Sequence, residues 1–91
     1  MPIIWKYTLG LLDKDYLIEI PINSKILDVQ IQQGLPVIWA LISNIEAPKE
    51  LYRFRWISTG DFIPIIDFFA YVGTCQFANG NLIFHLFYIK E

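Results

Sequence analysis

The sequence predicts an all-β fold, a small antiparallel sandwich or partly open barrel of about six to seven strands. Apolar and polar residues alternate along most of the chain, which is the spacing of strands with one buried face. Gly, Asn, Asp and Pro residues interrupt this alternation at roughly 8–12-residue intervals. No stretch combines the i, i+3, i+4, i+7 apolar spacing of an amphipathic helix with helix caps. We therefore expect short strands in a single domain over residues 1–91.

The clearest turn lies at Asn79-Gly80, inside a hairpin predicted from Phe69 to Phe87. A two-residue type I′ turn needs positive φ at both central residues, which Asn tolerates and Gly adopts freely. Counting outward from this turn, Phe77 faces Leu82. One face then carries the pairs Cys75–Phe84, Gly73–Leu86 and Tyr71–Tyr88, and the other carries Gln76–Ile83, Thr74–His85 and Val72–Phe87.

The other elements follow from the N-terminus. Ile3 to Leu9 alternates like a strand, and Tyr16 to Ile22 does the same up to Pro21. Because proline has no backbone N–H to donate, this second strand is expected to lie at a sheet edge or to stop at Pro21. A further tight turn is expected at Gln33-Gly34. Pro36 to Ser43 is apolar on both faces, which predicts a central strand covered on both sides.

Two more strands and one loop complete the prediction. In Ile26 to Gln32 the apolar face is expected to hold Leu27, Val29 and Ile31. In Leu51 to Ile57, the residues Tyr52, Phe54 and Trp56 oppose Arg53 and Arg55. Residues 58–67 contain Gly60 and Pro64 and are expected to form an irregular loop or a short helical turn.

Composition points to a protein with partners. Hydrophobic residues make up 55% and aromatic residues 16% of the 91-residue chain. A domain of this size cannot hide all of that surface, so we expect a homo-oligomer or a partner-binding face. The net charge of −2 gives no general attraction to extended nucleic acid or to anionic membranes. With no segment resembling a leader or a bilayer span, and one cysteine, the expected location is the cytoplasm.

The sequence contains no recognisable catalytic or metal-binding arrangement. His85 is the only histidine, which excludes a multi-histidine metal site within one chain. Cys75 is the obvious nucleophile to consider, but the hairpin register places it on the face opposite His85. No calcium loop and no phosphate-binding glycine loop is present. We therefore predict a protein that is not an enzyme and needs no cofactor.

A ligand-binding face is the main functional candidate. Arg53 and Arg55 project from one side of a strand and suit a phosphate or a carboxylate. The other candidate ligand-binding residues are Thr74, Gln76, His85 and the stacking residue Trp39, with Gln30, Gln32 and Trp56 as further contributors. The alternative is that the arginines and glutamines only line solvated strand faces.

Several short segments carry a resemblance along nearly the whole chain. They are Ile4-Trp5-Lys6-Tyr7, Lys25 to Gln32, Trp39-Ala40-Leu41, Thr59-Gly60, Tyr71-Val72-Gly73-Thr74 and Phe84-His85-Leu86-Phe87. In this order they resemble the W-K-Y, I-L-x-V-x-x-Q, W-A-L, T-G, Y-x-G-T and H-x-F motifs of a family of small uncharacterised proteins from bacteria and bacteriophages.

The resemblance implies a setting, since the family has no assigned activity. It suggests a phage-type accessory protein that counters host antiviral immunity. Such a protein would sequester a nucleotide second messenger as an oligomer, or dock on a host immune protein through an exposed aromatic surface. A small hydrolase using His85 is the third hypothesis.

Overall fold

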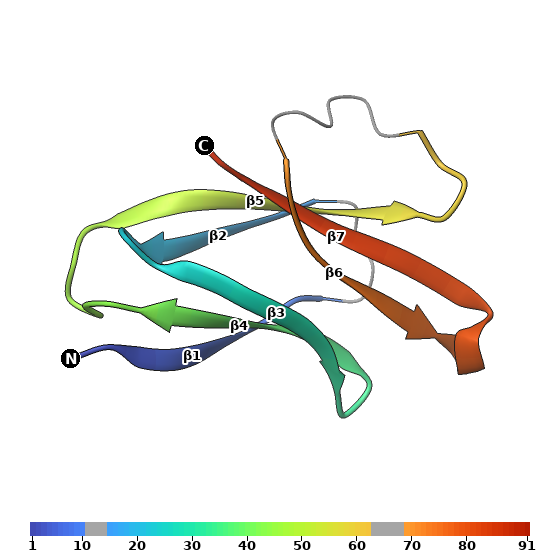
Figure 1. Cartoon of the computed structure of the whole chain (residues 1–91), viewed down its shortest axis with the longest axis horizontal. Helices are drawn as coiled ribbons and strands as arrows, with labels where there is room; N and C mark the ends of the chain where they lie inside the picture. The colour runs from blue at the N-terminus through green and yellow to red at the C-terminus, as the bar shows by residue number, and fades with distance from the viewer. Residues whose placement is uncertain (11–14, 63–68) are drawn as a thin grey trace.

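The computed structural model describes residues 1–10, 15–62 and 69–91, and it is a β-sandwich of two antiparallel sheets (Figure 1). The strands are β1 (Ile3–Thr8), β2 (Asp15–Pro21), β3 (Lys25–Gln32), β4 (Leu35–Ile42), β5 (Lys49–Ser58), β6 (Ala70–Phe77) and β7 (Leu82–Lys90). One sheet has the order β1-β4-β3 and the other β2-β5-β7-β6. The all-β prediction is confirmed, and of its two forms the sandwich is the correct one.

Two predicted strand positions are confirmed by this topology. β4 lies in the centre of its sheet, and Pro36, Val37, Ile38, Ala40 and Ile42 are all buried. β2 lies at the edge of the other sheet and ends at Pro21. Among the described residues, no helix is long and apolar enough to cross a membrane.

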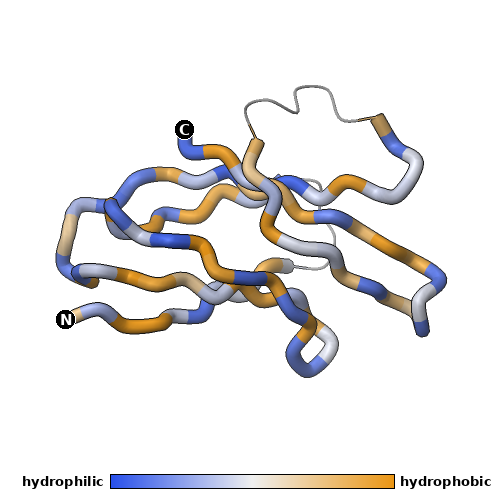
Figure 2. The backbone as a smooth tube through the Cα atoms, viewed as in Figure 1, coloured by the Kyte–Doolittle hydropathy of each residue, from blue (hydrophilic) through white to orange (hydrophobic). Residues whose placement is uncertain are grey.

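The core lies between the two sheets and is rich in aromatic rings. Tyr52, Phe54 and Trp56 alternate with the arginines of β5 and are 5% exposed or less, as the alternation predicted. Tyr88 of β7 stacks on Tyr52 with ring centroids 5.6 Å apart. Full burial of a large apolar side chain contributes roughly 1.5–3 kcal/mol, so this aromatic layer helps to hold the two sheets together. Figure 2 shows the hydrophobic and hydrophilic residues alternating along the strands.

The two predicted tight turns have the expected backbone. Asn79 and Gly80 both take positive φ, 55° and 86°, and the Asn81 N–H donates to the Ala78 carbonyl at 3.1 Å. Gln33 and Gly34 also take positive φ. Ala78 adopts φ 51° as well, which the sequence did not predict and which costs an L-residue about 1–2 kcal/mol.

The hairpin register is correct from Phe77 to Gly73 and wrong beyond it. A bulge at Val72 makes Tyr71 pair with Phe87 and Ala70 pair with Tyr88. The bulge comes directly before Gly73, where an added Cβ would lie only 2.8 Å from Val29 Cγ1 of β3. Because β6 approaches β3 this closely, the strand bends at a glycine, and the extra residue shifts the pairing.

A second bulge changes the buried face of β3. The pairing with β4 shifts between Ile26 and Asp28, so Ile26 packs against the core together with Val29. Leu27, at the bulge, is 42% exposed, and the prediction that it shares a face with Val29 was wrong. Ile31 stays in unbroken register with Val29, as predicted, although it is 38% exposed. In the predicted loop at 58–67, Ser58 ends β5, and residues 63–67 lie outside the described residues.

Candidate functional site

The outer face of the four-stranded sheet gathers most of the predicted site residues. Arg53 and Arg55 point outward because the neighbouring positions of β5 fill the core. Strand pairing sets Asp15, Arg55, Phe87 and Tyr71 in one row across β2, β5, β7 and β6. The next row along β5, β7 and β6 holds Ile57, His85 and Thr74.

Both arginines of this face bind the same carboxylate. Arg55 donates from Nε to Asp15 Oδ1 at 2.8 Å and from Nη2 to Oδ2 at 3.0 Å, and Arg53 Nη1 donates to Oδ2 at 3.1 Å. Arg53 also pairs with Glu91, and the Arg55 guanidinium lies 5.3 Å from the centre of the Phe69 ring. Hydrogen bonding from Arg55 lowers the pKa of Asp15 below its usual value, and burial opposes this effect. The positive charges of Arg53 and Arg55 are therefore largely neutralised by these carboxylates.

His85 lies in a chain of hydroxyl groups. Its Nε2 is 2.8 Å from Thr59 Oγ1 and its Nδ1 is 2.9 Å from Thr74 Oγ1. Thr74 Oγ1 in turn lies 2.6 Å from the Tyr71 hydroxyl. Both ring nitrogens thus have neutral hydroxyl partners, and among the described residues no carboxylate orients the ring as in a catalytic triad. These hydrogen bonds link β6 and β7 to Thr59, the residue that follows β5.

The structure separates Cys75 from His85, as the register predicted. Cys75 points into the core at 4% exposure, and burial raises the pKa of its thiol. A protonated thiol in the core is a poor nucleophile. In the described part of the chain, no cluster of three His, Cys, Asp or Glu side chains could hold a metal ion.

Trp39 is not part of this face. Of the predicted ligand-binding residues, Arg53, Arg55, Thr74, Gln76 and His85 lie on the outer face of the four-stranded sheet. Trp39 lies on the three-stranded sheet, beyond the core, and donates from Nε1 to Gln30 Oε1 at 3.0 Å. Gln32 accepts a bond from Lys6 Nζ at 2.7 Å in the same sheet.

Trp56 is also unsuited to stacking on a ligand. It is buried between the rings of Phe77 and Phe84, with centroid distances of 6.2 and 6.4 Å. The two tryptophans considered as stacking platforms are therefore both absent from the outer face of the four-stranded sheet.

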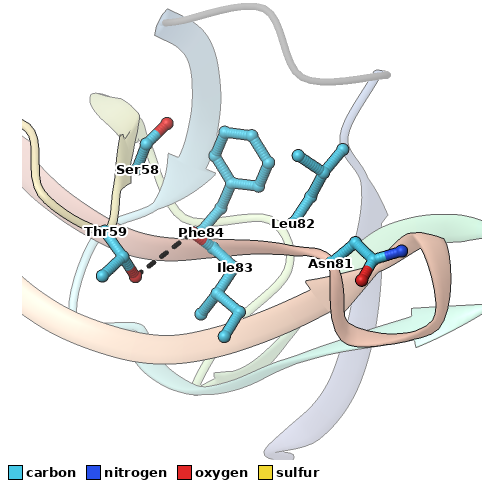
Figure 3. A pocket seen from close by; sticks show the side chains of 6 residues that line it. All are labelled: Ser58, Thr59, Asn81, Leu82, Ile83 and Phe84. Atoms are coloured by element: carbon cyan, nitrogen blue, oxygen red, sulfur yellow. Dashed lines mark hydrogen bonds between the residues drawn. The ribbon is translucent and has the colours of Figure 1, made fainter.

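A small hollow lies next to Thr59, the hydrogen-bond partner of His85, and Figure 3 shows the side chains that line it. It measures about 200 Å³ and is lined by Ser58, Thr59, Asn81, Leu82, Ile83 and Phe84. In Figure 3 the Thr59 hydroxyl reaches toward the Ile83 carbonyl oxygen, at 3.5 Å. Pockets for drug-sized or nucleotide-sized ligands usually span roughly 300–1,000 Å³. This hollow is smaller, and none of the predicted ligand-binding residues lines it.

Sequence reasoning missed four residues of the outer face. Asp15 and Thr59 were not among the predicted site residues, although each bonds one of them. Tyr71 and Phe87 were assigned to opposite faces, whereas their rings lie 5.5 Å apart. The available signal was Gly73, since a strand-interior glycine often marks a bulge, and a bulge would have moved Tyr71 to the face of Phe87.

The comparisons with known proteins locate the family but not an activity. No curated protein matches the chain, and no solved structure matches it. One family model does match, and it covers residues 1–91. The chain therefore belongs to the family described as "Domain of unknown function (DUF7352)".

Proposed function

We propose that this protein is a non-enzymatic binding protein that docks on another protein through the outer face of its four-stranded sheet. The observation that carries this proposal is the row of Asp15, Arg55, Phe87 and Tyr71 across the sheet. Tyr71 is 59% exposed and its ring leans on Phe87 at 5.5 Å. An exposed aromatic side chain held in place by a second ring is a typical anchor of protein interfaces.

The charges of this face also suit a protein partner. Arg55 is fixed by a bidentate bond to Asp15 and by the Phe69 ring, so binding would cost little side-chain entropy. Tyr and Arg are the residue types most enriched among interface hot spots. A protein partner needs no deep pocket, which fits the small size of the hollow beside His85.

The sequence resemblance supports a biological setting for this docking. Three of its segments meet on the outer face, because His85 of Phe84-His85-Leu86-Phe87 bonds Thr59 and Thr74. The protein would then be a phage-type accessory factor that acts in the cytosol of the host cell and inhibits a host defence protein.

A capture experiment with matched aromatic variants tests the proposal. The tagged wild-type protein should retain one stoichiometric partner from lysate of the host cell, and Tyr71→Ala should reduce its affinity by at least about 30-fold, the hot-spot range. Trp39→Ala, which removes an aromatic ring from the other sheet, should retain the partner. Equal retention by Tyr71→Ala and the wild type would contradict docking through this face.

A second candidate function is sequestration of a nucleotide signal. The observation that favours it is the convergence of Arg53 and Arg55 on one carboxylate, since two arginines in this geometry also grip a phosphate. A nucleotide would have to displace Asp15 from both guanidinium groups. Thermal-shift screening should therefore compare wild type with Asp15→Asn against cyclic and ADP-ribose-derived nucleotides. Sequestration predicts a larger shift for Asp15→Asn, and no shift in either protein would refute it.

A further inference from the structure

Strand β1 is an edge that lacks the usual protection against pairing. Among the described residues, β4 is the only strand that pairs with β1, and Figure 1 shows β1 at the outer side of its sheet. All six residues of β1 pair with β4 in one unbroken register. Ile4 is 61% exposed and Trp5 is 49% exposed. A regular, apolar edge of this kind is a template for another strand.

The other three edges are protected. β3 and β6 are bulged, at Leu27 and Val72, and their edges pack against each other near Gly73. In β2, the Ile22 N–H donates to the Pro48 carbonyl. Because bonded and non-bonded positions alternate along the strand, the backbone nitrogen of Pro21 faces the free edge, where it has no hydrogen to donate. Asp15 and Glu19 also direct their main-chain groups toward this edge, and both carry charged side chains. Bulges, proline and charge are the common devices against edge pairing.

Hydrogen-bond alternation shows which groups of β1 are free to pair. The Leu9 N–H donates to the Pro36 carbonyl at 2.9 Å, which continues the β1–β4 register. Bonded and non-bonded positions alternate in an antiparallel ladder, so Trp5 and Tyr7 direct their main-chain groups toward β4. The N–H and C=O groups of Ile4 and Lys6 therefore point outward.

We propose that β1 pairs with β1 of a second copy of this chain, in an antiparallel symmetric dimer centred on Trp5. The two copies would share one continuous sheet in the order β3-β4-β1-β1-β4-β3. This inference does not rest on the proposed docking function, which uses the other sheet.

The register centred on Trp5 is favoured by both its main-chain and its side-chain pairs. It brings the outward main-chain groups of Ile4 opposite those of Lys6 in the second copy, so each donor meets an acceptor. It also places Ile3 opposite Tyr7 and Trp5 opposite Trp5, which are favourable cross-strand pairs. A centre at Lys6 would instead set two ammonium groups opposite each other. Lys6 donates to Gln32 over the sheet face, so its charge is drawn away from the free edge.

Core-facing side chains are partly exposed at the β1 edge, so a second copy could cover them. Tyr7 packs against the core, and Trp5 lies on the same side of β1 but remains half exposed. Pairing at Trp5 would cover both rings and close the core layers of both copies. The exposed parts of the two Trp5 side chains amount to roughly 200 Å² of apolar surface, which the dimer would bury at its two-fold axis. Since a stable interface buries about 1,200 Å² or more, we expect a weak, concentration-dependent dimer.

Sedimentation equilibrium of the full chain tests the dimer. The wild type should show a monomer–dimer equilibrium, and Ile4→Pro should be monomeric, because it removes an outward N–H that β4 does not use. Circular dichroism would confirm that Ile4→Pro keeps its strands. A wild type that remains monomeric at the highest concentration accessible would overturn the proposal.

Two matched variants at Ile4 test the register and do not depend on the proline variant folding. Ile4→Glu and Ile4→Lys remove the same apolar side chain and place opposite charges across from Lys6 of the second copy. Ile4→Glu should dimerise more tightly than Ile4→Lys, by on the order of tenfold at low salt, and the gap should shrink as salt is added. Equal dissociation constants for the two variants would overturn the register centred on Trp5.

Discussion

Gly73→Ala probes the close approach of β6 to β3, on which the position of Tyr71 depends. The added Cβ would lie 2.8 Å from Val29 Cγ1, whereas ordinary contacts of this kind begin at 3.4 Å. Val29 is 5% exposed, so it has little free space into which to move. The two strands must therefore separate or Val29 must leave its preferred rotamer.

The expected cost follows from opposing terms. Overpacking a core typically costs about 1–3 kcal/mol, and replacing glycine by alanine in a strand regains about 0.5–1 kcal/mol of backbone entropy. The middle of these two ranges leaves a net loss of about 1 kcal/mol. For a domain of this size, that lowers the melting temperature by roughly 4–8 °C. Urea denaturation and differential scanning calorimetry would measure both quantities.

A double-mutant cycle with Val29→Ala identifies the cause. Val29→Ala alone should destabilise the fold by about 1.5–3 kcal/mol through lost burial. In the double variant the clash is gone, so its loss of unfolding free energy should be smaller than the sum of the two single-variant losses by about 1 kcal/mol or more. Additive losses, or a Gly73→Ala protein as stable as the wild type, would refute the packing argument.

Three further perturbations test other parts of the structure. Asp15 has a lowered pKa, so its contribution to stability is present above the unfolded-state pKa and is lost as the pH falls through the lower folded-state value. Asp15→Asn should therefore lose less unfolding free energy than the wild type between about pH 5 and pH 2, and equal losses would contradict this. Cys75 is buried with a raised thiol pKa, so a thiol reagent should label it only after unfolding, and fast labelling of the native protein would refute its placement. Ala78→Gly relieves a positive φ and should raise the unfolding free energy by up to about 1 kcal/mol in urea titrations, whereas a loss would argue against that conformation.

The sequence predicted the fold because its local signals agree with the tertiary structure. The strand alternation of Tyr52, Phe54 and Trp56 and the turn residues Asn79-Gly80 each depend on nearby positions alone. The sequence did not predict the two bulges, at Leu27 and Val72. Both lie where β3 meets β6, a contact between distant segments that no local pattern reveals.

The candidate site was predicted only in part for the same reason. The outward direction of Arg53, Arg55 and His85 follows from strand alternation, and it is correct. The pairing of both arginines with Asp15 depends on β2 lying beside β5, which residue spacing does not determine. The position of Trp39 in the other sheet likewise depends on how the strands divide between sheets.

Site-specific photo-crosslinking from position 71 would test most directly whether the outer face of the four-stranded sheet is a docking surface. A photoreactive phenylalanine analogue in place of Tyr71 keeps an aromatic ring at an exposed position, and the same analogue at Trp39 is the control on the other sheet. Our account predicts that, in host cells, position 71 crosslinks to one host protein and position 39 does not crosslink to it. Crosslinks of equal yield from both positions, or from position 39 alone, would contradict the account.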